Sequence, residues 1–424
     1  MKAVQFGRLW RGVNAAILLT AFFIALGGCT KPATTAIKAP QFRGTLTVMV
    51  SAGLAGYPGP AQPDVVWFQD QSRAYEAGHP GVKVELRVMP SPAELESAAR
   101  TAGVGDTPDL LFGRSLADLG PRLADLTTVL DQTALQEYLP GALEGFRDGA
   151  AQRGLPMLLD TQVLALNEAA FKAAGVTLPN EGRWSQAEFA DRLKKLSGAG
   201  HFGLSFYNLP GYHEWWPLLG APIGSGPTVD NVSVEGLQRL AQFGADGWLH
   251  PDTGKLTAEA TWSLFAANPP AFAVLPVGTW AIPLLRNPPF GVNVTIAGFP
   301  GETTLGYSYG VSVFAKQDAD RVKAAANLAQ FLTGPSNQIQ LARLTGLMPA
   351  GARTNNPWDG DPAMTRAFQV RTGHRTLRTG PGWEDAAPAV ARDLLYGLLG
   401  VRTPVESLQD AVAHITKATP PASK

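Results

Sequence analysis

The region after residue 40 alternates between short apolar stretches and longer amphipathic ones. β-branched residues and an alternation of apolar with polar positions predict strands, and apolar residues near helical spacing predict helices. The pattern predicts strand, helix, strand, helix and strand over 45–50, 65–76, 82–88, 92–101 and 109–112. This order is typical of a largely parallel sheet flanked by helices, an α/β fold. Because ligands bind beyond the carboxyl ends of such strands, the loops after Val50 and Phe112 are candidate binding loops.

Helix starts further along the chain carry recognisable capping residues. Ser185 and Glu188 have the spacing of a capping box, with Trp184 and Phe189 at the positions of a hydrophobic staple. We therefore interpret Trp184 as a structural residue. Asp320 predicts the N-cap of a later helix.

The N-terminus has the pattern of an export signal. Three basic residues precede an uncharged apolar run over 13–26, which at 14 residues is too short to cross a bilayer. The sequence Leu-Gly-Gly-Cys at 26–29 follows at once and resembles the lipobox of bacterial lipoproteins. We predict a signal peptide over 1–28, a flexible lipidated tether over 29–40, and diacylglycerol on the thiol of Cys29. The alternative is an ordinary signal peptide followed by a chance cysteine.

Composition narrows the class of protein. Residues 29–424 are too many for one ordinary core, so two domains are expected. Three of the 35 basic residues lie in the predicted signal peptide, which leaves 32 against 35 acidic residues. This balance gives no basic patch for nucleic acid. Cys29 is the only cysteine, so no internal disulfide is expected, and the nine tryptophans after residue 28 suit sugar rings as well as cores.

An ordered series of short motifs runs through the chain. Two of them are His-Pro-Gly-Val-Lys-Val at 79–84 and Gly-Asp-Thr-Pro-Asp-Leu-Leu-Phe at 105–112. The full series lies at 68–84, 105–112, 155–176, 184–193, 264–280 and 310–349. Its order resembles the extracellular solute-binding proteins of ABC importers, of the maltose-binding (carbohydrate, family 1) type. The chain departs from maltose binders at 164–167, at Gly113 and at 51–60. These departures bear on maltose itself and not on the class.

The resemblance implies a periplasmic-binding-protein type II fold, in which two α/β lobes are joined by crossing strands with a ligand cleft between them. It assigns 41–160 and 305–348 to the N-terminal lobe, and 161–304 and 349–424 to the C-terminal lobe. It implies capture of a carbohydrate, a di- or oligosaccharide, by hinge closure, and delivery to the permease subunits of an ABC importer. It further implies a monomer without cofactor or enzymatic activity. Such a protein is exported and lipid-anchored to the cell membrane, facing the periplasm or the cell exterior.

The resemblance also gives aromatic candidates for ligand binding. Trp280 follows a glycine at the family's second-lobe stacking position, and ligand contact and core packing are both open for it. Tyr212 or His213 lies near another stacking position, in a run that ends Trp-Pro-Leu as in maltose binders. Neighbours on a helix point about 100° apart, so one of Trp215 and Trp216 is expected to face the cleft. The match makes Trp216 the packed one. His213 has no partner at metal-ligand spacing, so no metal site is expected.

Further candidates lie where the chain is expected to cross between lobes. Asp160 is either an acceptor for two sugar hydroxyls or an ordinary turn residue. Arg114 follows the third strand and is either a cleft residue or a surface residue. Tyr307 and Tyr309 flank the return crossing, and the alternation of a strand puts them on one face. Trp383 precedes a C-terminal helix where the family often contributes a cleft aromatic.

Two other functions stay open. Residues 375–380, with Arg375 and Arg378, faintly resemble the C-terminal stretch of glycerol-phosphate binders, and arginine forks suit phosphate oxygens. The ligand would then be a glycerophosphodiester or another phosphorylated polyol. The other alternative is a secreted glycoside-acting enzyme. Against it, the chain has no H-E-x-x-H or P-loop motif, and nothing in the sequence places two carboxylates together.

Overall fold

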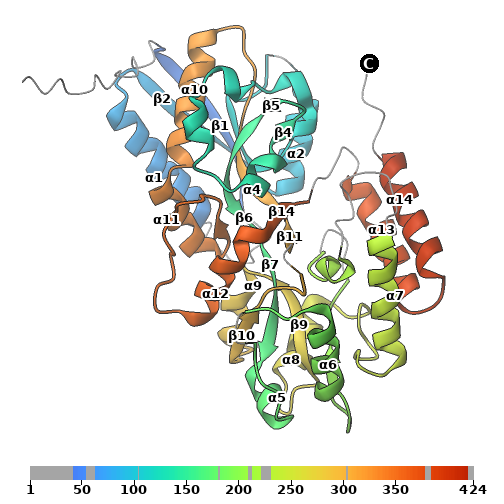
Figure 1. Ribbon diagram of the computed structural model, residues 1–424. Helices are drawn as coiled ribbons and strands as arrows, with labels where there is room; N and C mark the ends of the chain where they lie inside the picture. The colour runs from blue at the N-terminus through green and yellow to red at the C-terminus, as the bar shows by residue number, and fades with distance from the viewer. Residues whose placement is uncertain are drawn as a thin grey trace, which may run out of the picture. The chain divides into compact units, whose positions relative to one another are not determined.

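Six strands form the larger of the two main sheets in the computed structural model (Figure 1). Their order is β13-β6-β12-β3-β1-β2, with bounds β1 Gly44–Ser51, β2 Val82–Met89, β3 Leu110–Arg114, β6 Gly154–Leu159, β12 Ser308–Val313 and β13 Met348–Pro349. β1 runs parallel to β2 and β3, and the helices α1 (Pro63–Gly78) and α2 (Pro92–Thr101) lie between these strands in the sequence. The predicted β-α-β-α-β unit is therefore confirmed. β12, β6 and β13 extend it through antiparallel pairs.

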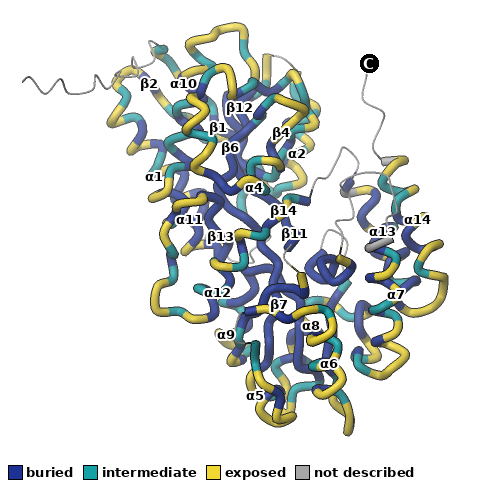
Figure 2. The backbone as a smooth tube through the Cα atoms, in the orientation of Figure 1, coloured by how far each residue is buried: buried dark blue, intermediate teal, exposed yellow. Residues whose placement is uncertain are grey.

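A second sheet has four strands in the order β10-β7-β9-β8. Their bounds are β7 Gln162–Asn167, β8 Phe202–Leu204, β9 Phe272–Gly278 and β10 Val294–Ala297. Every residue of β7 and β9 is buried, because helices and loops cover both faces of these central strands (Figure 2). The mixed helix and sheet content, divided between two sheets, confirms the expected α/β class.

The chain passes between the two sheets in two places. Asp160 and Thr161 alone separate β6 from β7, and the return runs through β11 (Thr304–Gly306) and Tyr307 into β12. The Asp160 N–H donates to the Tyr307 carbonyl at 2.8 Å, which joins the two crossings. β11 also pairs with β14 (His374–Thr376). The strands of the two sheets agree with the two lobes predicted from sequence, while the exact lobe boundaries stay a prediction.

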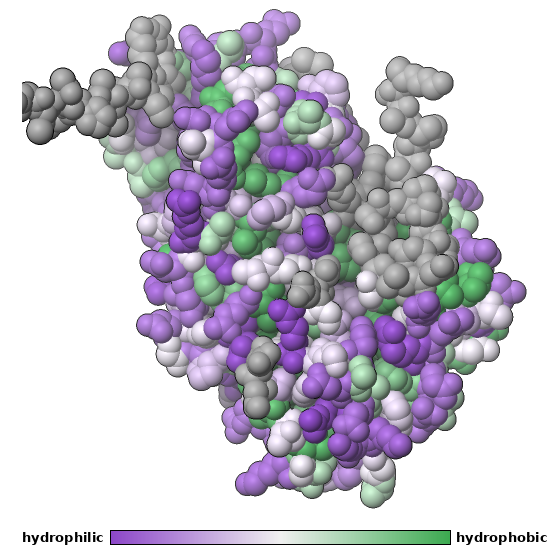
Figure 3. All heavy atoms as spheres, viewed as in Figure 1, coloured by the Kyte–Doolittle hydropathy of each residue, from purple (hydrophilic) through white to green (hydrophobic). Residues whose placement is uncertain are grey.

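The remaining elements pack on the sheets or form a helical group beside them. They are α3 Gln132–Leu135, α4 Pro140–Gly145, β4 Arg147–Asp148, β5 Ala151–Gln152, α5 Glu168–Ala173, α6 Gln186–Leu196, α7 Asn231–Ala245, α8 Ala258–Ala266, α9 Ala281–Arg286, α10 Ala319–Leu332, α11 Pro335–Thr345, α12 Pro362–Val370, α13 Trp383–Leu398 and α14 Pro404–Ala418. α13 and α14 pack against each other and on α7. Among the helices that the structure describes, none is both long and apolar enough to span a bilayer. Hydrophilic residues are spread widely over the face drawn in Figure 3.

Local capping explains where two of these helices begin. The Ser185–Glu188 capping box is confirmed, since each side chain accepts a hydrogen bond from the other residue's backbone N–H, and Trp184 stacks against Phe189. The prediction for α10 was wrong by two residues. Asp318, not Asp320, is the N-cap, because its carboxylate is the group that accepts from the free N–H groups of the first turn.

The structure describes residues 42–53, 63–103, 105–179, 182–208, 213–220, 231–301, 304–377 and 383–418. The predicted signal peptide, the Cys29 lipid site and the tether lie outside the described residues. So do two predicted ligand-binding residues, Tyr212 and Arg378.

Candidate ligand-binding site

Asp160 lies in the first crossing between the sheets and is buried, with 7% of its surface exposed. Its Oδ1 atom has no hydrogen-bond partner among the described residues. Burial raises the pKa of this carboxyl group to about 7, although the nearby Arg114 guanidinium acts to lower it. Buried polar atoms in native proteins are nearly always hydrogen-bonded, so an oxygen in this state is a candidate for ligand contact.

Two glycines allow the chain to close around Asp160. A Cβ on Gly278, the last residue of β9, would lie 2.6 Å from Asp160 Oδ1 and closer still to Trp280 Nε1. A Cβ on Gly306, the last residue of β11, would overlap with the Asp160 carbonyl oxygen. Real Cβ atoms do not approach other atoms this closely. These positions therefore need glycine, and the close approach brings Asp160 and Trp280 together.

Trp280 is the residue before α9 and is buried, with 7% of its surface exposed. Its ring contacts Trp262, with centroids 5.8 Å apart and an interplanar angle of 55°. Trp262 Nε1 has no hydrogen-bond partner in the described part of the chain. Trp280 thus has a core-like environment on one side and the Asp160 carboxylate on another. Its predicted role in ligand contact stays a prediction, with Asp160 as its neighbour.

Arg114 ends β3 and contacts both tyrosines that flank the return crossing. Its guanidinium lies over the Tyr307 ring, 3.7 Å from the centroid. It also hydrogen-bonds the hydroxyl of Tyr309, its register partner on β12, while burial raises the pKa of that hydroxyl well above its usual value. Because one guanidinium reaches both rings, Tyr307 and Tyr309 lie on the same side, as the strand alternation predicts. The structure therefore brings Arg114, Tyr307 and Tyr309 together beside Asp160.

A second aromatic group joins these residues from the other sheet. The His213 ring meets the Tyr307 ring edge-on, with centroids 4.6 Å apart, and is tilted against Trp216 at 5.6 Å. Trp216 in turn meets Trp383, the first residue of α13, edge-on at 5.9 Å. With the Gln162 amide oriented to satisfy its neighbours, its oxygen accepts from His213 Nε2 at 2.9 Å. His213 and Trp383 thus belong to the same group of side chains as Tyr307.

The assignment of the two adjacent tryptophans needs correction. Trp215 is fully buried, its ring stacks on Phe206 with centroids 4.7 Å apart, and its Nε1 donates to Asn208 at 3.1 Å. Trp216, which the resemblance made the packed residue, is also buried, with 2% of its surface exposed, but it packs against His213 and Trp383, and its Nε1 has no partner among the described residues. Trp215 precedes the 3₁₀ helix at 216–219, where neighbours still point apart, so the contacts of each ring decide which one belongs to the candidate site. Trp216 replaces Trp215 in the candidate site.

Sequence reasoning missed Glu214. This side chain is 4% exposed, and its Oε1 accepts a hydrogen bond from the Tyr207 hydroxyl at 2.9 Å. Burial, followed by the charge of Asp160, raises the pKa of Glu214 to about 8. The structure therefore brings together two buried carboxylates that the sequence analysis had not paired. A signal was available, because a lone carboxylate inside the aromatic run 212–216 is costly to bury without a purpose.

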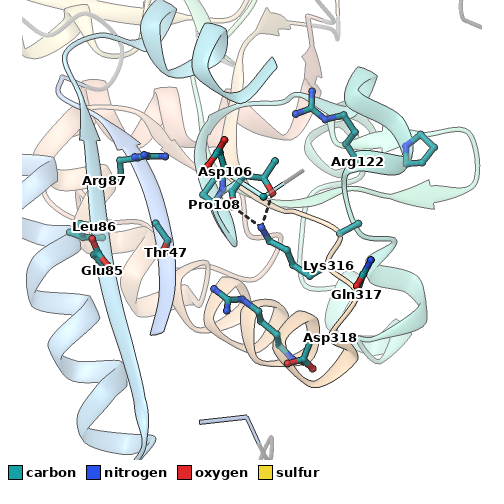
Figure 4. A pocket seen from close by; sticks show the side chains of 15 residues that line it. Thr47, Glu85, Leu86, Arg87, Asp106, Pro108, Arg122, Lys316, Gln317 and Asp318 are labelled. Atoms are coloured by element: carbon teal, nitrogen blue, oxygen red, sulfur yellow. Dashed lines mark hydrogen bonds between the residues drawn. The ribbon is translucent and has the colours of Figure 1, made fainter. Parts of the chain in front are cut away.

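A separate hollow of about 1290 Å³ lies in the larger sheet, near the ends of β3 and β12 that are away from Asp160 (Figure 4). It is lined by residues before β3 and after β12, whereas Arg114 and Ser308 mark the other ends of these strands. Three of its cations have protein partners: Lys316 donates to Thr107, Arg321 pairs with Asp109, and Arg122 donates to carbonyl groups at the end of α2. The candidate site is therefore the group around Asp160.

Two sheets, two hydrogen-bonded crossings and a buried polar and aromatic group at the crossings define a ligand-binding protein of the two-lobed periplasmic type. Residues 71–366 match the family model described as bacterial extracellular solute-binding protein. The chain belongs to this family. It is therefore an extracellular solute-binding protein, as its motif order predicted.

Individual relatives agree with this assignment. An uncharacterized lipoprotein of Streptomyces antibioticus is 25% identical over an alignment of 379 residues that covers 78% of this chain and 80% of the relative. The cyclic alpha-maltosyl-1,6-maltose binding protein of Arthrobacter globiformis has a similar structure, with TM-score 0.69, 17% identity, and coverage of 89% of this chain and 99% of that one. A Staphylococcus aureus extracellular solute-binding protein, solved in complex with maltose, has TM-score 0.66 and 16% identity, covering 88% and 97%. These structures confirm the predicted periplasmic-binding fold.

Proposed function

We propose that this protein captures a carbohydrate, a di- or oligosaccharide, by closure of its two lobes and delivers it to the permease of an ABC importer. One observation carries the proposal: the unpartnered Oδ1 of Asp160 lies beside the indole of Trp280, across Gly278. An acceptor next to a flat apolar ring suits a sugar, which presents hydroxyl groups around an apolar patch of C–H bonds.

The surrounding residues support the same ligand class. Arg114 offers donors from the six-stranded sheet, and His213 and Trp216 offer aromatic surface from the segment after β8. Groups that come from both sheets can bind one ligand together only when the lobes are closed. Closure would then be driven by contacts that the open state lacks, and it would present the permease with a changed surface. Two of the similar solved structures are named for maltose or a cyclic maltosyl-maltose.

Electrostatics favours a neutral sugar over a phosphorylated ligand. Asp160 and Glu214 are buried together, and above pH 8, where both are ionised, each carboxylate would repel a phosphate placed beside them. Arg114, which also contacts Tyr307 and Tyr309, is the cation beside Asp160, so one positive charge faces two carboxyl groups. Hydroxyl groups, in contrast, donate to carboxylates without bringing a charge. The glycerophosphodiester alternative therefore has weaker support from this site.

The enzyme alternative is addressed by the same pair of side chains. Glycosidases use two carboxyl groups, one of them with a raised pKa. Asp160 and Glu214 are likewise two carboxyl groups with raised pKa values. Membership in a family of solute-binding proteins supports binding without turnover. Incubation of the protein with each sugar, followed by product analysis, tests this directly, and a released sugar would overturn the binding assignment.

Export and anchoring complete the proposed function. The Streptomyces antibioticus relative is named a lipoprotein, and the lipobox sequence before Cys29 supports the same processing here. We infer a monomer held to the membrane by lipid on Cys29, with residues 29–40 as the tether. The folded body would then meet its ligand outside the membrane and stay close to the permease.

A thermal-shift screen tests the ligand class. The panel contains mono-, di- and oligosaccharides, including maltose, trehalose, cellobiose and maltotetraose, and glycerophosphodiesters as the competing class. A ligand that binds only the native state stabilises it by about 2.7 kcal/mol at a hundredfold excess over Kd. This stabilisation raises the melting temperature. A shift with a sugar is the expected result. A shift with glycerophosphodiesters alone would replace the proposal by the phosphate alternative.

A further inference from the structure

We propose that Glu214 is a second ligand-binding carboxylate of this site, that Tyr207 positions it, and that the pair Asp160 and Glu214 selects a neutral ligand with at least two hydroxyl donors. The inference rests on the proposed function and deepens it, because it names the groups that would read the hydroxyls. Glu214 and Tyr207 were not candidates on sequence grounds, whereas Asp160 was.

The first step is the hydrogen bond that fixes one oxygen of Glu214. Tyr207 is 2% exposed, and its hydroxyl donates to Glu214 Oε1 at 2.9 Å. The Tyr207 ring is itself held edge-on against Trp262, with centroids 6.3 Å apart, and Trp262 contacts Trp280. Tyr207 therefore links Glu214 to the aromatic residues beside Asp160. A phenol held this way leaves the carboxylate little freedom to rotate.

The second step concerns the other oxygen. Glu214 Oε2 is buried and has no hydrogen-bond partner among the described residues, like Asp160 Oδ1. A carboxylate that served only to hold the fold would have both oxygens satisfied, because an unsatisfied buried acceptor costs about 1–3 kcal/mol or more when it is charged. The Arg114 cation lies beside Asp160. Glu214 thus keeps one oxygen without a hydrogen-bond partner among the described residues, while the nearby backbone N–H groups of His213 and Glu214 act to lower its pKa.

The third step places the two acceptors in one site. Asp160 is close enough to Glu214 for its charge to raise the pKa of the latter. The residue before Glu214 is His213, whose ring contacts Tyr307, and the Tyr307 carbonyl accepts from the Asp160 backbone. Glu214 and Asp160 therefore belong to one set of contacts. Two acceptors of like charge repel each other, and a ligand that donates a hydroxyl to each would relieve this cost.

The chemistry of the pair sets the ligand class. A carboxylate with a free oxygen accepts hydrogen bonds and donates none when ionised. A ligand with two hydroxyl donors, such as neighbouring hydroxyls of a sugar ring, satisfies Asp160 Oδ1 and Glu214 Oε2 together. Above pH 8, where both carboxyl groups are ionised, a ligand that is itself anionic would add a third negative group to the site. Selection against anionic sugars, such as uronic acids and sugar phosphates, follows from the same two residues.

Glu214→Gln is the main variant, because glutamine can still accept from Tyr207 but carries no charge. The matched control is Glu259→Gln, which changes an exposed residue of α8 in the same manner. Each variant is compared with the wild type in two measurements, the melting temperature without sugar near pH 8 and the affinity for the tightest-binding sugar of the panel. We expect Glu214→Gln to melt at a higher temperature, because a costly buried charge is removed, and to bind that sugar about tenfold or more weakly, which is about 1.4 kcal/mol. Glu259→Gln should match the wild type in both.

Two outcomes would overturn the role of Glu214 while leaving the proposed function intact. One is an unchanged affinity in Glu214→Gln, whatever happens to the melting temperature. The other is a Tyr207→Phe variant that binds as tightly as the wild type with the same pH dependence, and this variant also serves if Glu214→Gln fails to fold. The expected Tyr207→Phe result is weaker binding with its pH profile moved upward, because the lost hydrogen bond no longer lowers the pKa of Glu214. If the wild type binds no sugar of the panel, the proposed function itself fails, and the inference with it.

Discussion

Asp160 and Trp280 approach each other across the backbone of Gly278, with a carboxylate oxygen 2.6 Å from the point where a Cβ would stand. The two side chains come from different parts of the chain, one from the first crossing between the sheets and the other from the turn after β9. An acceptor and a flat apolar ring thereby meet at one place. The first two predictions concern these two residues.

Trp280→Ala should weaken sugar binding by about 2 kcal/mol or more, as expected for a buried aromatic anchor. This is roughly a thirtyfold rise in Kd, measurable by calorimetry. Without sugar, the variant should lose much less stability than a core tryptophan, whose truncation costs about 3–5 kcal/mol. Trp184→Ala is the matched control, since Trp184 stacks between Phe171 and Phe189 in the core. If Trp280→Ala unfolds the ligand-free protein like Trp184→Ala and the folded fraction binds normally, Trp280 is a core residue.

Asp160→Asn should change how stability depends on pH. The pKa of Asp160 is about 7 in the folded protein, above its usual value near 4. Between these two values the folded state binds more protons than the unfolded state, so the wild type loses stability as pH rises through this window. Asparagine does not titrate. The stability of the variant relative to the wild type should therefore be greater near pH 8 than near pH 4. Melting temperatures across this range measure the difference, and a constant difference would contradict the burial argument.

Sugar binding should depend weakly on salt. A neutral ligand brings no charge to be screened, whereas a phosphorylated ligand would bind less tightly as ionic strength rises. Calorimetry over a series of salt concentrations, with the tightest-binding sugar of the panel, measures this dependence. Arg378→Ala is the informative variant, because Arg378 carried the phosphate alternative. A steep salt dependence that disappears in Arg378→Ala would favour the phosphorylated ligand.

Cys29→Ala should abolish lipid attachment and leave ligand binding unchanged. The thiol of Cys29 is the group predicted to take the diacylglycerol, and the tether separates it from the folded body. Metabolic labelling with a radioactive fatty acid measures the attachment, and the thermal-shift assay measures the binding. Label retained on the Cys29→Ala protein would show that the lipobox prediction is wrong.

Much of the larger sheet could be predicted from sequence because its signals are local. The helix over 92–101 was predicted with its observed bounds, since Ser91 caps it, Pro92 opens it and its apolar residues recur at helical spacing. Asp318 was missed because Asp318 and Asp320 both lie at the start of the same helix, and only the backbone geometry decides which carboxylate reaches the free N–H groups. The motif order identified the family because it reports on many segments at once.

The site was predicted in part. Asp160 was proposed from its place in the expected crossing, and Tyr307 and Tyr309 from strand alternation. The choice between Trp215 and Trp216 depends on tertiary contacts that the local sequence does not show, because Trp215 packs on Phe206 whereas Trp216 contacts Trp383. Glu214 was missed because its burial depends on Tyr207 and on a crossing far away in sequence.

Gly278 limits how this protein could diversify during evolution. Any other residue there would collide with the Asp160 carboxylate and the Trp280 ring, so that position cannot be used to alter ligand preference. Gly306 is restricted in the same way by the Asp160 carbonyl group. If the proposed site is right, ligand preference is open to change in the segment that contains His213, Glu214 and the neighbouring aromatic residues, and not at the two glycines.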